Sequence, residues 1–188
     1  MSEIYIQEEG YRLDRIISML AGIGSGRDMQ RAVNAALRRA SSAGRAEAGR
    51  YVSERYYISA STFKKYFESE DKMEGGEGSE QSLNVYFRGN VIPLIEFNTT
   101  YSKGGGVNVK VKKGGGGTLN HAFISNMNGS YQVYERYGKG KGKIKRLYGP
   151  SAAHMLQDSS VNEKMQKRMN DVFSQRMEHE VDRMMNGW

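Results

Sequence analysis

Residues 121–151 read HAFISNMNGSYQVYERYGKGKGKIKRLYGPS, and this stretch decides the fold that we predict. It begins with a short apolar run at residues 122–124. Asn128-Gly129 follows, a pair that tolerates positive φ and therefore favours a tight β-hairpin turn. Residues 131–137 then alternate in polarity with period two, as a half-exposed strand does. The pattern predicts a β-hairpin.

The end of the same stretch predicts a return strand and the start of a helix. The return strand begins at Ile144, after a run of lysines and glycines. Gly149 ends an extended segment, Pro150 suits the first turn of a helix, and Ser151 closes the unit. Because none of these residues forms a catalytic set, we interpret the stretch as scaffold.

Three stretches upstream have strand patterns. Residues 83–88 alternate regularly, and residues 91–97 are more apolar, with Pro93 placing them at a sheet edge or a bulge. Residues 107–112 alternate valine with asparagine and lysine, which predicts a strand with one basic face. With the hairpin strands, these give about five strands joined by short or glycine-rich links, and hence an antiparallel sheet.

Helical spacing flanks the strands on both sides. Residues 11–21 carry one apolar face of a short helix. Residues 27–57 form the longest helical stretch of this half, although Gly44 and Gly49 lower its helix propensity. Residues 59–67 predict a turn and a short capped helix. The apolar stripe of the long helix consists of Met29, Val33, Ala36, Leu37 and Ala40.

The C-terminal part predicts a short helix at residues 150–157 and a long one at 159–186. Ser159 or Ser160 can cap the long helix, and Glu163 lies at the capping-box spacing from Ser160. Its stripe consists of Val161, Met165, Met169, Val172, Phe173, Met177, Val181 and Met184. We expect this stripe to pack against the sheet, although methionine also suits an adaptable subunit contact near the C-terminus.

The order of helices, then strands, then helices argues against alternating βαβ units and predicts an α+β fold. In it, an antiparallel β-sheet of about four to six strands is packed by a long N-terminal helix and a C-terminal helix. We expect residues 1–188 to form a single domain. Its parts are a helical part at residues 11–67, a flexible acidic loop at 68–80, a β-sheet part at 81–148 and C-terminal helices at 150–186.

Composition excludes several kinds of chemistry. With no cysteine among 188 residues, disulfide, thiolate and zinc-finger chemistry are not available. No apolar run approaches the roughly 20 residues that span a bilayer. The first residues lack a signal-peptide pattern. We therefore expect a soluble protein that is made in the cytoplasm and has no membrane partner.

The net charge of +7 is unevenly distributed along the chain. Residues 68–80 carry one basic residue against six acidic ones, whereas residues 81–148 carry eleven against two. The basic middle is either a solvated surface that keeps the protein soluble or a surface that faces a polyanion or an acidic partner.

The sequence predicts no catalytic, metal or cofactor site. The glycine clusters lack Gly-Lys-Ser/Thr, and no Gly-x-Gly-x-x-Gly opens a helix after a strand. His121, His154 and His179 are far apart and outside any zinc-binding pattern. Glu178 and Glu180, beside His179, are expected to be solvated on a charged helix end. Since a nucleophile-elbow sequence is also lacking, we do not expect an enzyme.

Six segments occur in a fixed order, namely Ile92–Ile95, Val107–Val111, His121–Ile124, Met127–Gly129, Tyr134–Gly138 and Ile144–Ser151. The set covers roughly residues 92–157 and resembles the C-terminal half of the minor tail protein Z family of tailed bacteriophages and prophages. The structural motif comprises Pro93, His121, Phe123, Asn128, Gly129, Tyr148, Gly149 and Pro150. Family members usually carry a proline before the isoleucine that corresponds to Ile144, and a run richer in arginine before that proline. Here residues 139–143 interleave lysine with glycine, so this connection is expected to be looser.

The resemblance implies a structural virion protein that completes the head-proximal end of a phage tail and supports head–tail joining. It implies a location in the virion tail, no cofactor, and self-association as a ring, expected to be a hexamer. The implied partners are other tail and neck proteins, such as the tail terminator and the tail tube or connector rings. The alternative is a basic accessory protein of phage DNA packaging that binds DNA without sequence preference.

The candidate interaction residues lie in two basic segments. They are Val107, Lys110, Lys112, Lys113, Lys139, Lys141, Lys143, Lys145 and Arg146. Lysine among glycines gives mobile, hydrated charges, unlike the rigid arginine forks that read bases. Any contact with DNA in the tail channel should therefore be to phosphates. We favour an acidic neighbouring protein, because many lysines per subunit holding the DNA would retard its ejection.

Overall fold

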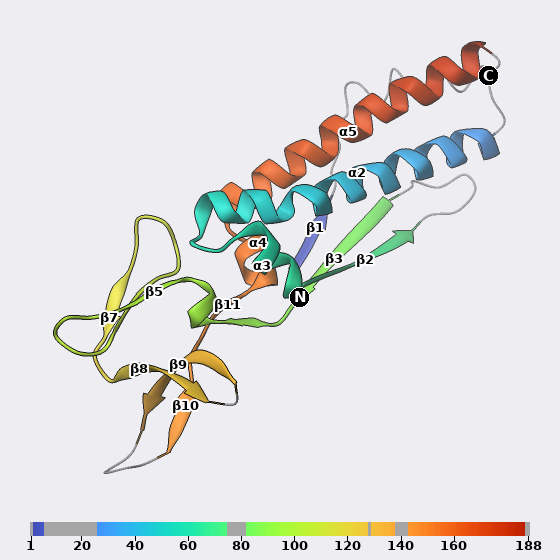
Figure 1. The fold of residues 1–188 in the computed structure, drawn as a ribbon. Coiled ribbons are helices and arrows are strands. Elements are labelled where there is room, and N and C mark those ends of the chain that lie inside the picture. The colour runs from blue at the N-terminus through green and yellow to red at the C-terminus, as the bar shows by residue number, and fades with distance from the viewer. Residues whose placement is uncertain (1, 6–25, 75–81, 128, 138–142, 187–188) are drawn as a thin grey trace. The chain divides into compact units, whose positions relative to one another are not determined.

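Figure 1 shows the computed structural model, in which helices and antiparallel strands are mixed. The structure describes residues 2–5, 26–74, 82–127, 129–137 and 143–186. The described elements are β1 (Ser2–Tyr5), α2 (Gly26–Arg55), α3 (Ala60–Lys65), β2 (Phe67–Glu74), β3 (Ser82–Gly89), β4 (Val91–Pro93), η1 (Leu94–Glu96), β5 (Asn98–Tyr101), β6 (Val107–Lys110), β7 (Gly117–Leu119), β8 (Ala122–Met127), β9 (Ser130–Arg136), β10 (Ile144–Arg146), β11 (Tyr148–Ser151), α4 (Ala152–Leu156) and α5 (Ser159–Asn186). The predicted α+β class is confirmed. The helix predicted at residues 11–21 lies outside the described residues.

The chain divides into two compact units, which are described separately. The first comprises Met1–Ala48, Ser69–Phe87 and Asn162–Trp188, and the second comprises Gly49–Glu68 and Arg88–Val161. The second unit has fifteen Lys and Arg against five Asp and Glu, a net charge of +10, whereas the first has thirteen against sixteen, a net charge of −3. That residues 1–188 act as one domain stays a prediction.

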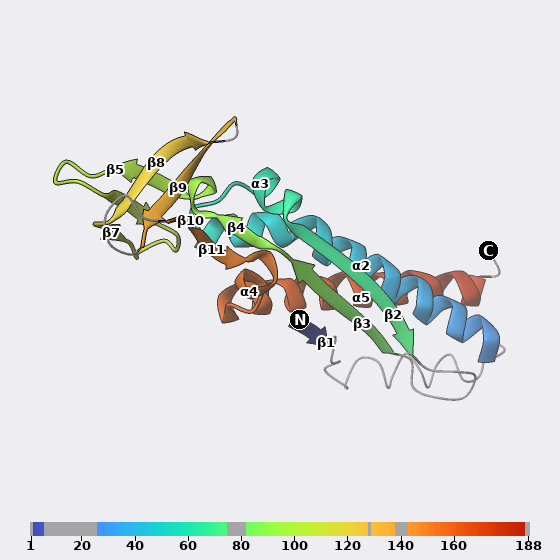
Figure 2. The ribbon, with the colours of Figure 1, turned by 90° about the horizontal axis from the view of Figure 1, so that it is seen from below.

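In the first unit, α2 and α5 run antiparallel and side by side (Figures 1 and 2). The buried ridge of α2 carries only small residues at intervals of four, namely Ala32, Ala36, Ala40, Gly44 and Ala48. Small side chains on one ridge let a neighbouring helix approach closely. A Cβ added to Gly44 would lie 2.7 Å from both Cγ and Sδ of Met169. Gly44 lies within the continuous helix α2. Its missing side chain makes room for Met169 of α5.

Six of the eight residues predicted for the stripe of α5 are confirmed as core, whereas Val172 and Met184 are only half-buried. Its buried members are Val161, Met165, Met169, Phe173, Met177 and Val181. One prediction about this helix is wrong, because Glu180 is only 2% exposed. Its carboxylate is ion-paired with Arg176 at 2.5 Å and with Arg183 at 2.8 Å. These arginines lie about one helical turn on either side, so the carboxylate is buried together with opposite charge rather than alone.

The sheet of the first unit has the strand order β1–β3–β2, with β1 and β3 antiparallel. The prediction of a flexible loop at residues 68–80 is wrong for its first half, which forms β2. Exposure alternates along this strand, with Glu68, Glu70 and Lys72 exposed. Asp71 points the other way, where it is 3.0 Å from Arg45 Nη1 and accepts a hydrogen bond from Ser41 Oγ at 2.9 Å. The acidic composition concealed a strand whose charges alternate between water and partners on α2.

In the second unit, the hairpin predicted from residues 121–137 is confirmed as β8 and β9. Met127 pairs with Ser130, which leaves a two-residue turn, and Gly129 has φ +82°. The predicted return strand is β10, in which Ile144 pairs with Arg136. Asn128 and residues 138–142 lie outside the described residues.

The strands of the second unit do not join the single sheet that we predicted. Those that the structure describes form the sheets β5–β6–β7, β10–β9–β8 and β11–β4. Strands β5 and β7 were not predicted, because each is short and is followed or preceded by glycines. Periodicity indicates that a segment is a strand but not which strand it pairs with, and short strands between glycine-rich links can pair locally.

The motif around Gly149 differs from its prediction. Pro150 lies in β11 rather than in a helix, and α4 begins only after Ser151, whose Oγ accepts a hydrogen bond from His154 N at 3.1 Å. A Cβ on Gly149 would lie 2.6 Å from the ring of Phe97, so close packing rather than the end of a strand requires the glycine. Pro93 lies in β4, which pairs with β11 across a register shift, and its predicted place at an edge or bulge is confirmed.

Gly89 gives a test of packing in the second unit. A Cβ at this position would lie 2.6 Å from Ala152 Cβ and 2.8 Å from the carbonyl oxygen of Tyr66. We expect Gly89→Ala to lower the free energy of unfolding by about 1–3 kcal/mol, because backbone must move to admit the methyl group. The matched control is Gly104→Ala, where nothing lies within 4 Å, and which should change it by less than about 0.5 kcal/mol. Equal urea midpoints for both variants would contradict the packing.

Candidate interaction surface

Most of the large apolar and aromatic side chains that are exposed lie in the second unit. Among residues whose burial is described, the exposed ones in this unit are Val91, Tyr101, Leu119, Tyr131, Tyr137, Ile144 and Tyr148. Tyr101 and Tyr131 are 66% and 63% exposed. Aromatic side chains are enriched at protein–protein interfaces, because a tyrosine combines a large apolar surface with a polar tip. In the first unit, Met185 is the only exposed large apolar side chain among the residues whose burial is described.

Four of the predicted lysines are exposed in the same unit. One of them, Lys145, is ion-paired with Glu135, and the other three define the surface. Lys110 ends β6, Lys113 follows it, and Lys143 precedes β10. With Tyr101, Tyr131, Tyr137 and Tyr148, these three lysines are called the tyrosine–lysine set below. Exposed lysines around aromatic contacts contribute to the rate and specificity of association more than to its strength.

Other predicted interaction residues have different positions. Val107 is fully buried in the core, so it does not belong to the surface. Lys145 is 3.0 Å from Glu135 Oε2 across the β9–β10 pair. The guanidinium of Arg146 lies 5.2 Å from the centre of the Tyr148 ring. Lys139 and Lys141 lie outside the described residues.

Two members of the structural motif, Phe123 and His121, also have clear positions. The ring of Phe123 stacks on that of Tyr134 with 6.0 Å between centres, and the guanidinium of Arg136 lies 5.4 Å from the Phe123 ring centre. His121 is exposed in the turn before β8. Phe123 and Tyr134 are cross-strand partners in the β8–β9 hairpin, so their stacked rings contribute to its packing.

The exposed face of the β5–β6–β7 sheet forms an open groove of about 430 Å³. The cross-strand partners Asn98 and Lys110, and Thr100 and Asn108, lie on this face. Thr118 Oγ1 donates a hydrogen bond to Asn108 Oδ1 at 2.6 Å. The opposite face contributes Val107 and Val109 to the core. The predicted one-sided strand is confirmed, but its outer face is mostly amide and hydroxyl groups rather than basic.

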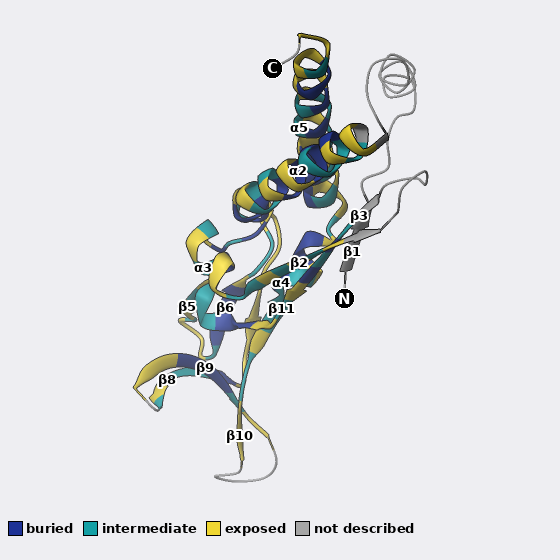
Figure 3. Ribbon diagram, turned by 90° about the vertical axis from the view of Figure 1, so that its right-hand side faces the viewer, coloured by how far each residue is buried: buried dark blue, intermediate teal, exposed yellow. Residues whose placement is uncertain are grey.

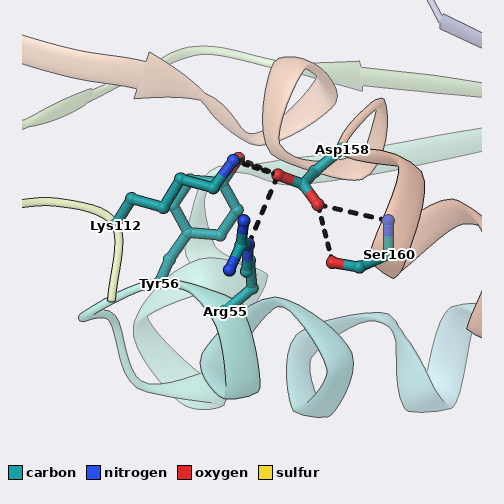
Figure 4. A network of polar contacts seen from close by, with 5 residues as sticks. All are labelled: Arg55, Tyr56, Lys112, Asp158 and Ser160. Atoms are coloured by element: carbon teal, nitrogen blue, oxygen red, sulfur yellow. Dashed lines mark hydrogen bonds and ion pairs between the residues drawn. The ribbon is translucent and has the colours of Figure 1, made fainter. Parts of the chain in front are cut away.

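Lys112 is the predicted residue whose role differs most, because its ammonium group lies 2.5 Å from Asp158 Oδ2. Figure 4 shows the network around this carboxylate. Arg55 Nε lies 3.6 Å from the same oxygen, and the Tyr56 hydroxyl donates to it at 3.4 Å. Ser160 donates to Oδ1 from both Oγ, at 2.7 Å, and the backbone N, at 3.2 Å. One carboxylate thus joins α2, the segment after β6 and the start of α5.

The backbone reinforces this junction. Residues Tyr56 and Lys112 form an antiparallel bridge, Tyr57 N donates to the Val111 carbonyl at 2.8 Å, and Lys113 N donates to the Arg55 carbonyl at 2.9 Å. The hydrogen bond from Lys112, followed by those from Ser160, holds the pKa of Asp158 far below its ordinary value of 3.8. Burial, followed by the charge of Asp158, raises the pKa of Tyr56 above 10.0.

The predicted cap of α5 is wrong, because Asp158 rather than Ser159 or Ser160 caps the helix. The Asp158 side chain accepts from the backbone N of Ser160, at the second position of the helix. Aspartate caps a helix about as well as serine, so the Asp-Ser-Ser sequence allowed three choices. The two cations beside Asp158 decided among them, and their proximity is not visible in the sequence.

No group of three or more histidine and acidic side chains among the described residues could hold a metal ion. No helix in the described part of the chain is long and apolar enough to cross a membrane.

Exposed tyrosines such as Tyr101 and Tyr131 are typical of surfaces that contact other proteins. A family model described as prophage minor tail protein Z (GPZ) matches residues 24–186. Because this match covers most of the chain, the protein belongs to the prophage minor tail protein Z family. It is therefore a structural component of a phage tail that interacts with other tail proteins. Searches of curated proteins and of solved structures found no match.

Proposed function

We propose that this protein completes the head-proximal end of the tail and supports the joining of head and tail. Membership in the minor tail protein Z family carries this proposal, because it places the chain among tail structural proteins. The exposed tyrosine–lysine set supports it, since tyrosines are enriched where proteins meet and exposed lysines contribute to the rate and specificity of association. The partners are the tail terminator and the tail tube or connector rings, and both units act together as one tail-completion domain.

We further propose that the protein acts as a ring of six copies. A closed ring requires heterologous contacts, in which two different surfaces of each subunit meet. The charge of +10 on the second unit and −3 on the first gives each copy two electrostatically different surfaces. Electrostatic complementarity of this kind favours such contacts over identical ones.

Electron microscopy of particles that lack the protein tests the proposed function. We expect separate heads and tails, or joined particles that do not infect. Normal numbers of DNA-filled, infectious particles would contradict the proposal.

Replacing three exposed lysines by glutamine tests what the basic surface faces. We expect Lys110→Gln, Lys113→Gln and Lys143→Gln in one chain to reduce head–tail joining by about tenfold or more, since charge complementarity with a protein partner is lost. DNA binding by the free protein should be unchanged. The control is Lys64→Gln, Lys65→Gln and Lys167→Gln, which removes the same charge from other exposed positions. Normal joining with altered DNA retention or delivery would instead indicate that these lysines face DNA in the tail channel.

A further inference from the structure

Strand β10 forms one edge of the sheet β10–β9–β8. None of the strands that the structure describes pairs with the outer side of β10. Ile144 and Lys145 are exposed, and Figure 3 shows β10 coloured largely as exposed. An edge strand of this kind presents backbone N–H and C=O groups that another strand can bind.

The hydrogen bonds at the two ends of β10 determine which backbone groups point outward. Tyr137 N donates to the Lys143 carbonyl at 3.0 Å, and Leu147 N donates to the Val133 carbonyl at 2.8 Å. In an antiparallel pair, the residues that exchange hydrogen bonds alternate with residues that do not. Lys145 therefore directs its N–H and C=O toward β9. Ile144 and Arg146 direct theirs to the outer edge.

The charges around this edge are mostly positive. Lys143 precedes the strand, Lys145 and Arg146 belong to it, and Arg136 is the cross-strand partner of Ile144. Glu135 balances only one of these four cations. A second copy of the same edge would bring its own cations alongside, so pairing of two identical edges is disfavoured. An acidic strand would meet opposite charge on both faces of the sheet.

We propose that the outer edge of β10 binds an extended, acidic segment of a neighbouring virion protein by strand addition. Backbone hydrogen bonds to Ile144 and Arg146 supply the affinity, and the surrounding lysines and arginines select the acidic sequence. This inference deepens the proposed function and rests on it, because it specifies how the tail protein holds its partner.

Ile144→Pro tests the backbone contact. Proline removes the N–H that points outward and leaves the hydrogen bonds of Lys145 to β9 in place. We expect the purified variant to keep the thermal midpoint of the wild-type protein, and head–tail joining in particles to fall by about tenfold to a hundredfold. Ile144→Val, which retains the N–H, should join normally. Lys145→Pro should instead lower the thermal midpoint, because its N–H faces β9.

Photo-crosslinking keeps the inference testable if Ile144→Pro does not fold. The crosslinkable amino acid p-benzoylphenylalanine replaces Tyr137, which is 47% exposed and lies next to Lys143 in the sheet. Crosslinked particles are digested, and the attached peptide is identified by mass spectrometry. We expect a peptide of another virion protein with net negative charge. Crosslinks to DNA, to a second copy of this chain, or to no partner would overturn the proposal.

The two proposals fail in different ways. If particles without the protein join and infect normally, the proposed function is wrong. If the protein is required but Ile144→Pro folds and joins as well as Ile144→Val, the proposed function stands and the strand-addition inference is wrong.

Discussion

Replacing Asp158 by alanine is expected to lower the free energy of unfolding by about 2–4 kcal/mol at pH 7. The substitution removes the cap of α5 and leaves Lys112 without the carboxylate that lies 2.5 Å away. Loss of a helix cap alone costs about 1 kcal/mol, and loss of charged hydrogen bonds at a side chain only 8% exposed adds the remainder. Urea denaturation measures the effect. Asp171→Ala, at an exposed position of α5, should change stability by less than about 0.5 kcal/mol.

The same group predicts a pH dependence with a definite sign. The pKa of Asp158 is lowered by folding from its ordinary value of 3.8, so the folded protein binds the proton less readily than the unfolded chain. Its contribution is therefore fully present above pH 3.8 and is lost as the pH falls below that value. We expect the stability difference between wild type and Asp158→Asn to be constant from pH 7 to about pH 5, and to shrink below about pH 4. A difference that grows on acidification would contradict the network.

Met169→Ala is expected to lower the free energy of unfolding by about 2–4 kcal/mol, because it empties a fully buried position between α5 and α2. Met169→Leu keeps most of the volume and should cost less than about 1.5 kcal/mol. Equal effects of the two substitutions would indicate that methionine serves a partner surface rather than the core.

The effect of Gly44→Ala on the free energy of unfolding should change sign with the residue at position 169. In the wild-type chain, its Cβ would lie 2.7 Å from the Met169 side chain, and crowding of about 1–3 kcal/mol outweighs the gain in helix propensity of about 1 kcal/mol. In Met169→Ala, the space is vacant and Gly44→Ala should stabilise by about 1 kcal/mol. A double-mutant cycle by chemical denaturation measures this coupling. Additive effects would show that the two positions do not touch.

The hairpin β8–β9 and the helices α2 and α5 could be predicted from the sequence because each depends on local pattern. Asn128-Gly129 favours one turn, and an apolar stripe favours one helical face. Strand β2 could not be predicted in this way, since its acidic composition resembles that of a loop. Its stability depends on residues about 30 positions earlier in the chain. Arg45 forms an ion pair with Asp71, and Ser41 donates a hydrogen bond to it.

The interaction surface was predicted only in part. The lysine positions were found because charge is visible in a sequence, and Lys110, Lys113 and Lys143 are indeed exposed. The exposed Tyr101 lies in a strand that no pattern indicated. Lys112, with the same composition around it, instead faces Asp158. Burial of a tyrosine and pairing of a lysine depend on which distant segment lies beside them.

The sequence by itself determined the family, the α+β class, the hairpin and the two long helices, since local periodicity, turn chemistry and the order of short motifs encode them. Only the tertiary structure decided the separate small sheets, the buried Glu180, the cap of α5 and the open edge of β10. The physical reason is that strand pairing and ion pairing join residues far apart in the chain. Their free energy depends on distance and burial, which no single segment specifies.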